Sequence, residues 1–263
     1  MTEEIKLRCF DMSRIGENKV SIFLGKRNSG KSFCVKDMLY YKKDIPIVRV
    51  ISGTERANRH YGNFIPPAFI EYTFSDDIIT AFMKRQQDLR AKSTDMRYQN
   101  MDRRAMLILD DLMFDKNSWV KNPNIKEIAM NGRHWDISFI ITLQYCLGIP
   151  PDLRTNVDYV FLFKENRMAE RIKIYKYWAG VIPTFKLFCE IMDRCTEEYG
   201  CLVIDNASRS NKIEDQVYYY RAQEHEAFKM CGSRAWTYSE QHNHSNSSNS
   251  SKKTKSQYKV ILE

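Results

Sequence analysis

Short apolar runs alternate with amphipathic stretches along most of the chain. The runs are rich in β-branched and aromatic residues, which is typical of buried strands. We expect strands at 19–24, 47–52, 105–109, 137–143, 159–163, 201–205 and 217–221. Helical spacing of apolar positions predicts helices at 35–41, 75–92, 124–131, 165–179 and 183–194. This alternation predicts an α/β fold, a mostly parallel sheet with helices on both faces and a ligand site at the carboxyl ends of the strands.

Three stretches lack both patterns. Residues 53–67 are rich in Gly, Asn and Pro and are expected to form a loop, and residues 93–104 are polar and expected to be mobile. The composition changes after Gly232, and residues 242–255 are mostly Ser, Asn, His and Lys. We therefore expect one folded domain at 1–230 and a low-complexity, disordered tail at 231–263.

On the predicted helix 165–179, apolar and basic residues separate onto different sides. The expected core-facing side carries Met168, Ile172, Tyr175 and Ala179. Lys164, Arg167 and Arg171 lie on another side of this helix.

Composition narrows the class of protein only slightly. The 263 residues contain 41 Lys and Arg against 33 Asp and Glu, a net charge of +8 that suits a partner such as nucleic acid. No apolar run reaches the roughly 18 residues of a membrane span, and the acidic start Met1–Glu4 does not look like a signal peptide. The seven cysteines are scattered without a C-x-x-C pair, so we expect reduced thiols in a cytosol-like compartment.

One motif dominates the candidate chemistry. The stretch Gly25, Lys26, Arg27, Asn28, Ser29, Gly30, Lys31, Ser32 fits the phosphate-loop pattern G-x-x-x-x-G-K-[ST]. It lies between a predicted strand and a predicted helix, where backbone N–H groups and the helix N-terminus favour an anion. Lys31 is expected to reach the β- and γ-phosphates, and the Ser32 hydroxyl to bind Mg²⁺. The motif therefore predicts binding of a nucleoside triphosphate.

Acidic and amide side chains end two further strands. Asp110 follows the apolar run 105–109, as a Walker B acid does, and would bind Mg²⁺, through water. Asp111 is a candidate for polarising the attacking water, although it could instead cap the following turn. Gln144 ends the strand 137–143 and could contact the γ-phosphate and the water, or simply be a polar strand end.

Two arginines are candidates for stabilising transition-state charge, in their own or a neighbouring subunit. Arg133 follows a short predicted helix, and Arg154 lies in the turn Pro150–Asn156. Arg27, inside the phosphate loop, is a third candidate.

Taken together, these motifs resemble the genome-packaging ATPases of large nucleocytoplasmic DNA viruses, which belong to the FtsK–HerA class. The resemblance rests on G-K-R-N-S-G-K-S at 25–32, L-I-L-D-D at 107–111, N-G-R-H at 131–134, I-T-L-Q at 141–144 and I-P-P-D-L-R-T-N at 149–156. The Gln-ended strand with the Pro-Pro-x-Leu-Arg turn is the most specific part. The phosphate loop alone is shared by many families.

The resemblance implies a RecA-like (ASCE) P-loop NTPase in which the Gln144 strand lies between the phosphate-loop strand and the Asp110 strand. It implies ATP and Mg²⁺ as cofactors, a homo-oligomeric ring, pentameric or hexameric, and double-stranded DNA in its centre. It further implies action in the host cytoplasm (virus factory) or the virion, with capsid proteins as possible partners. By this resemblance, Asp111 stands where the wider class prefers Glu.

Basic side chains that could contact the DNA backbone are Lys84, Arg85, Arg103, Arg104, Arg167 and Arg171. A solvated helix face is the alternative interpretation of each.

Three other functions remain open at this point. A P-loop nucleotide kinase would need an arginine-rich lid, for which Arg97, Arg103 and Arg104 are available. A GTPase would need a guanine-reading motif, and Asn211–Glu214 only approximates N-K-x-D. A non-catalytic scaffold would use nucleotide only to stabilise assembly.

Overall fold

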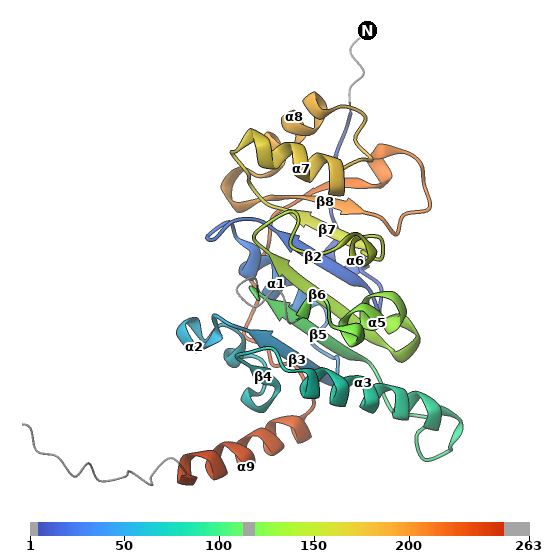
Figure 1. Ribbon diagram of the computed structural model, residues 1–263, viewed down its shortest axis with the longest axis vertical. Coiled ribbons are helices and arrows are strands. Elements are labelled where there is room, and N and C mark those ends of the chain that lie inside the picture. The colour runs from blue at the N-terminus through green and yellow to red at the C-terminus, as the bar shows by residue number, and fades with distance from the viewer. Residues whose placement is uncertain (1–4, 113–118, 250–263) are drawn as a thin grey trace, which may run out of the picture.

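The fold is built on one mixed sheet with helices on both faces (Figure 1). The computed structural model describes residues 5–112 and 119–249. Within these residues the sheet has nine strands in the order β1-β9-β8-β7-β2-β6-β5-β3-β4. The strands are β1 Arg8–Cys9, β2 Val20–Leu24, β3 Ile47–Ser52, β4 Ile70–Glu71, β5 Ala105–Asp110, β6 Ile137–Leu143, β7 Tyr159–Leu162, β8 Cys201–Asp205 and β9 Val217–Tyr220.

Strand direction decides which residues share the functional edge of the sheet. All pairings among β4, β3, β5, β6, β2 and β7 are parallel, and β1 is parallel to β9. β8 is antiparallel to both of its neighbours, β7 and β9. The start of β8 and the end of β9 therefore lie at the same edge as the carboxyl ends of β2, β5 and β6.

Helices and short 3₁₀ turns connect the strands. The helices are α1 Lys31–Tyr40, α2 Glu55–Asn58, α3 Asp76–Ala91, α5 Pro123–Asn131, α6 Pro151–Arg154, α7 Met168–Trp178, α8 Phe185–Cys195 and α9 Ser233–Asn249. The 3₁₀ turns are η1 Met12–Arg14, η2 Tyr61–Asn63, η3 Pro67–Phe69, η4 Lys92–Thr94, η6 Gly132–Trp135, η7 Glu197–Tyr199 and η8 Ile213–Asp215. Most elements fall within a few residues of the bounds that the sequence predicts.

Two apolar clusters cover the two faces of the sheet. Alternate residues of β2 belong to the two clusters, because successive side chains of a strand point to opposite faces of the sheet. Ile22 joins the cluster that contains α3, α5, α6, α7 and α8 residues, and Phe23 joins the cluster formed with α1. Phe23 stacks on Phe161 with ring centroids 4.5 Å apart. The predicted α/β class with helices on both faces is confirmed.

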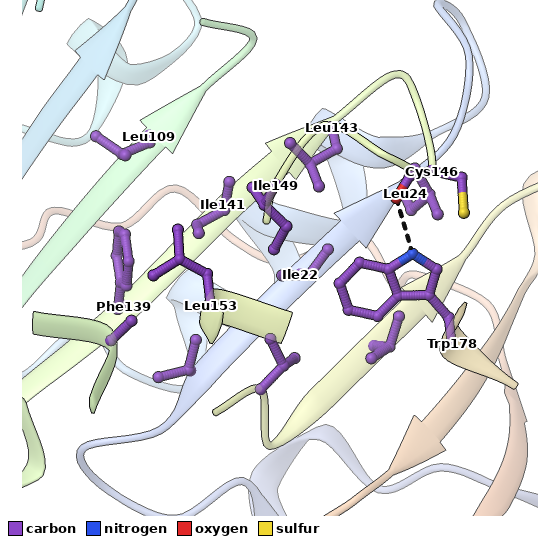
Figure 2. Packing of buried hydrophobic residues seen from close by; sticks show 14 of the residues in the cluster. Ile22, Leu24, Leu109, Phe139, Ile141, Leu143, Cys146, Ile149, Leu153 and Trp178 are labelled. Carbon is purple, nitrogen blue, oxygen red and sulfur yellow. Dashed lines mark hydrogen bonds between the residues drawn. The ribbon is translucent and has the colours of Figure 1, made fainter. Parts of the chain in front are cut away.

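One buried tryptophan ties α7 to the loop that follows β6 (Figure 2). The indole Nε1 of Trp178 donates a hydrogen bond of 3.1 Å to the carbonyl oxygen of Cys146. Both side chains are buried in the first cluster with Leu24, Leu143 and Ile149. This bond fixes the path of the chain directly after Gln144.

Replacing Trp178 with phenylalanine should lower the free energy of unfolding by roughly 1–3 kcal/mol, because the Cys146 carbonyl loses its partner inside the core. Urea unfolding followed by circular dichroism measures this loss. Trp135→Phe, at a half-buried position, is the control and should change stability less. Equal stability of the Trp178 variant and the wild type would contradict the prediction.

The structure differs from the sequence expectations at three places. Residues 53–67 are not only a loop, because they form α2 and η2, and Tyr61 is fully buried. Residues 233–249, expected in the disordered tail, form α9. The Ser239 hydroxyl in α9 accepts a 3.0 Å hydrogen bond from the Ala68 N–H, so tertiary contact supports this helix. Residues 1–4 and 250–263 lie outside the described residues.

The third difference is the face that α7 buries. Of the predicted side, Ala179 is buried and Tyr175 packs against the core, but Met168 and Ile172 are exposed. Arg171, Ile174 and Trp178 are buried instead. Burial of Arg171 is possible because its guanidinium forms an ion pair with the Asp193 carboxylate and donates to the Glu165 carbonyl. A charged residue that the pattern placed in solvent thus lies inside.

The seven cysteines are all free thiols, as predicted. Over the ranges 5–112 and 119–249, no helix is both long and apolar enough to span a membrane.

Candidate functional site

The phosphate loop connects β2 to α1 and is shaped by its two glycines. Gly30 has φ of +96°, a conformation that side-chain-bearing residues rarely adopt. A Cβ on Gly25 would lie 2.6 Å from the Phe163 Cβ, so only glycine permits the approach of the β7 end. The N–H groups of 25–32 are thus held in the compact turn that an anion requires.

A cavity of about 950 Å³ opens above this loop at the carboxyl edge of the sheet. Its lining includes most of the loop, the ends of β5 and β6, the segment after β3, and residues beside β8 and β9. The lining residues on which the argument depends are Lys31, Ser32, Asp110, Asp111, Gln144, Glu198, Tyr199 and Arg221.

Lys31 lies at the centre of the loop. Its ammonium donates to the carbonyl oxygens of Gly25 and Lys26, the latter at 2.6 Å. Burial lowers the pKa of Lys31, while the nearby charges of Asp111 and Asp110 act in the opposite direction. The Ser29 Oγ is buried and has no hydrogen-bond partner among the described residues. A phosphate group would supply acceptors for both the ammonium and this hydroxyl.

Asp110 ends β5 and is held by hydroxyls of both neighbouring strands. Its Oδ2 accepts from Ser52 Oγ at 2.9 Å, and its Oδ1 accepts from Thr142 Oγ1 at 2.8 Å. Burial raises the pKa of Asp110, and these two hydrogen bonds act against that rise. The Ser32 hydroxyl and the Asp110 carboxylate are hard oxygen donors, which fits the preference of Mg²⁺ for one or two protein ligands with retained waters.

Asp111 and Gln144 contact each other directly. The Gln144 Nε2 donates to the Asp111 Oδ1 at 2.5 Å, and the Asp111 N–H donates to Thr142 Oγ1 at 2.9 Å. Asp111 has φ of +50°, a left-handed conformation that Asp tolerates better than most residues. The two candidates for handling water are therefore joined in one hydrogen-bonded pair.

The predicted arginines do not join this group. Arg133 lies on η6, immediately before β6, and thus at the amino edge of the sheet, opposite the cavity. Arg154 lies on α6, with its guanidinium carbon 4.5 Å from the centroid of the Tyr177 ring, and does not line the cavity. Arg27 does line it. A role of Arg133 or Arg154 therefore requires a neighbouring subunit and stays a prediction.

Several supporting residues escape the sequence motifs. Glu165, after β7, forms an ion pair of 2.6 Å with Lys26 Nζ and so anchors the loop from outside the motif. Ser52 and Thr142 orient Asp110, and their position at the ends of predicted strands beside β5 is a signal that could have revealed them. Glu198, Tyr199 and Arg221 line the cavity from β8 and β9, and no sequence pattern marks them.

The sheet order and the assembled loop define a class of protein. The Gln144 strand β6 lies between the phosphate-loop strand β2 and the Asp110 strand β5, as predicted. The chain has a P-loop NTPase fold with a RecA-like core. The family described as "Poxvirus A32 protein" matches residues 10–232, and the chain belongs to this family.

Relatives in large DNA viruses support the same assignment. The uncharacterized protein L437 of Acanthamoeba polyphaga mimivirus is 35% identical over 223 residues, which are 84% of this chain and 78% of that protein. The uncharacterized protein 088R of Invertebrate iridescent virus 3 is 34% identical over 230 residues, 83% of this chain and 85% of that protein. The resemblance inferred from the motifs is confirmed at the family level.

Solved structures share the fold at low identity. The genome-packaging NTPase B204 of Sulfolobus turreted icosahedral virus 2, in complex with sulfate, matches with a TM-score of 0.55 and 16% identity over 81% of this chain and 100% of that one. The same protein has also been solved with ATP-gammaS. The conjugation coupling protein TcpA of pCW3 matches with a TM-score of 0.53 and 15% identity, covering 81% of this chain and 61% of that one.

Proposed function

We propose that this protein is an ATP-hydrolysing motor that moves double-stranded DNA, packaging a viral genome into a preformed capsid. The observation that carries the proposal is the convergence of Lys31, Asp110 and the Asp111–Gln144 pair on one cavity at the carboxyl edge of the sheet. Membership of the Poxvirus A32 protein family supports it, and so does the structural similarity to B204, a genome-packaging NTPase.

Binding of ATP would use the phosphate loop as the anion site. The ammonium of Lys31 would leave the carbonyl oxygens of the loop and donate to the β- and γ-phosphate oxygens. Ser32 and Asp110 would hold Mg²⁺, which when bound neutralises charge on the β- and γ-phosphate oxygens. The Ser52 and Thr142 hydroxyls keep the Asp110 carboxylate oriented for this task.

Hydrolysis needs a water molecule aligned with the γ-phosphate. Asp111 would accept a proton from that water as its oxygen attacks phosphorus and the bond to the bridging oxygen of ADP breaks. Gln144 holds the Asp111 carboxylate through its amide N–H and so fixes the direction from which the proton leaves. The products are ADP and inorganic phosphate.

Contact with DNA would use fewer of the basic residues than the sequence suggested. Arg103 pairs with Asp136, Arg104 pairs with Asp102 and Asp44, and Arg171 is buried against Asp193. These guanidiniums are already neutralised within the chain. Lys84 and Arg167 are exposed, but the Arg167 Nε also lies 3.6 Å from the Glu165 Oε1, so Lys84 is the stronger candidate of that set. We propose that this contact is made in a homo-oligomeric ring, in infected cells or at the capsid.

The kinase alternative finds little support in the same contacts. Its lid arginines are Arg97, Arg103 and Arg104, and each forms an ion pair with an aspartate. They lie in the connection that precedes β5, at the amino edge of the sheet, whereas the cavity is at the carboxyl edge. A transferred phosphoryl group would therefore be far from them.

The proposal is tested by measuring ATP turnover with and without duplex DNA, together with the mass of the assembly in solution. We expect hydrolysis that duplex DNA stimulates and an oligomeric mass. Turnover that is indifferent to duplex DNA in an assembled ring would contradict translocation, and phosphoryl transfer to a nucleoside monophosphate would favour the kinase instead.

A further inference from the structure

The sheet order determines the direction in which a bound nucleotide extends from the phosphate loop. The γ-phosphate must lie toward β6 and β5, where Gln144, Asp111 and Asp110 end their strands. The α-phosphate lies at the other end of the triphosphate, so the ribose and base extend away from these strands. On that side of β2, the sheet continues through β7, β8 and β9.

Because β8 is reversed, its first residues return to the functional edge beside the phosphate loop. Glu198 and Tyr199 are separated from β8 only by Gly200, and both adopt left-handed backbone conformations, with φ of +46° and +63°. A Cβ on Gly30 would lie 3.3 Å from the Tyr199 Cβ, which places this tyrosine directly over the loop. Gly200 then permits the chain to pass close to the Cys195 carbonyl oxygen, where any side chain would collide.

The position of Tyr199 is not explained by packing in the core. It is 71% exposed although it lines the cavity, and its backbone conformation is strained for a residue with a side chain. The segment after β3 lines the cavity with Thr54, Ala57 and Asn58, none of which has an aromatic ring. Phe33 also lines it and is 40% exposed, but it lies on α1 directly after Ser32 and does not come from the β7–β9 side toward which the base extends. An exposed aromatic ring beside a phosphate site is suited to stacking on a base.

An ion pair holds the segment that carries Tyr199. Arg221 follows the end of β9, and its Nη1 lies 2.9 Å from the Glu198 Oε2. Both side chains are largely exposed, so the pair contributes little to overall stability. The pair connects the segment that carries Glu198 and Tyr199 to the end of β9, and both Glu198 and Arg221 line the cavity.

We propose that Tyr199 stacks on the nucleobase of the bound nucleotide and that Arg221 positions this ring by holding Glu198. The inference rests on the proposed nucleotide site but not on hydrolysis or on DNA movement. It assigns the two ends of the nucleotide to different parts of the fold: the triphosphate to the loop, β5 and β6, and the base to the segment before β8.

The test compares a ligand that has a base with one that lacks it. Isothermal titration calorimetry of the full chain measures the Kd of ATP and of inorganic tripolyphosphate, both with Mg²⁺. For Tyr199→Ala we expect the Kd of ATP to rise about tenfold, the loss of one base–aromatic stack, with the Kd of tripolyphosphate unchanged. Tyr199→Phe should keep the wild-type Kd of ATP, since the ring is retained.

Tyr219→Ala is the matched control, because Tyr219 is a partly exposed tyrosine on β9 that does not line this cavity. Arg221→Ala should weaken ATP less than Tyr199→Ala and leave tripolyphosphate unchanged. Equal effects of Tyr199→Ala on both ligands, or none on either, would overturn the inference. A wild-type protein that binds ATP in this Tyr199-dependent way without hydrolysing it would instead overturn the proposed function.

Discussion

Replacing Lys31 with alanine is expected to lower the ATP turnover number by about 100-fold to 1,000-fold, the cost of removing one preorganised donor to developing charge. The ammonium lies within the phosphate loop and close enough to Asp110 and Asp111 for their charges to affect its pKa. It is therefore placed to neutralise the oxygens that gain charge as the terminal phosphoryl group departs. A phosphate-release assay at saturating ATP measures the loss.

The same substitution should not destabilise the nucleotide-free protein. Removing the Lys31 ammonium takes a donor from two backbone carbonyls, but burial lowers the pKa of this ammonium, so its removal also relieves a desolvation cost that offsets this loss. We expect the Tm without nucleotide to stay close to that of the wild type. Lys43→Ala, an exposed lysine beyond the end of α1, is the control for lost positive charge. Wild-type turnover in Lys31→Ala would refute the assignment of the loop as a hydrolytic site.

Most of the sheet could be predicted because its central strands are buried on both faces. Such strands are continuous apolar runs, which stand out in any sequence. β3 has the predicted bounds, and β5 differs only by including Asp110. No single apolar run indicates the order of the strands in the sheet. The placement of β6 between β2 and β5 was predicted from the resemblance to a family.

The centre of the site could also be predicted, since its residues follow motifs that are local in sequence. Lys31 and Ser32 belong to one loop, and Asp110 and Gln144 are the polar residues that end apolar strands. The Asp111–Gln144 hydrogen bond could not be anticipated, because it depends on the exact alignment of two strand ends. Contacts from Glu165 and Tyr199 depend on the return of distant segments to the same edge.

The wrong predictions for α7 and α9 have the same physical cause: tertiary contacts outweighed the local composition of the sequence. Arg171 is buried because Asp193, 22 residues away, neutralises it, and the buried face of α7 is shifted so that Met168 and Ile172 are exposed. Part of the polar C-terminal region forms α9 because Ser239 and Ala235 are buried, and α9 packs beside η3. In both cases, partners that are distant in the chain decide the outcome.

Asp111→Asn should separate binding from chemistry. Asparagine keeps the size of the side chain, can still accept the hydrogen bond from Gln144, and tolerates the left-handed backbone at φ of +50°. It cannot accept a proton at neutral pH. We expect the turnover number to fall by about 100-fold to 10,000-fold, the range for loss of a general base, while the Kd of ATP stays within about threefold. Single-turnover hydrolysis and calorimetric titration with ATP measure the two quantities.

This variant also decides between the two interpretations of Asp111. If the carboxylate only caps the turn after β5, asparagine serves equally well, since both side chains accept hydrogen bonds from nearby N–H groups. Wild-type turnover in Asp111→Asn would then exclude a role as base. Gln144→Ala is the complementary variant, because it leaves the Asp111 carboxylate intact but removes the amide that orients it. Its turnover should fall less than that of Asp111→Asn, since a misdirected base still accepts protons whereas an amide accepts none.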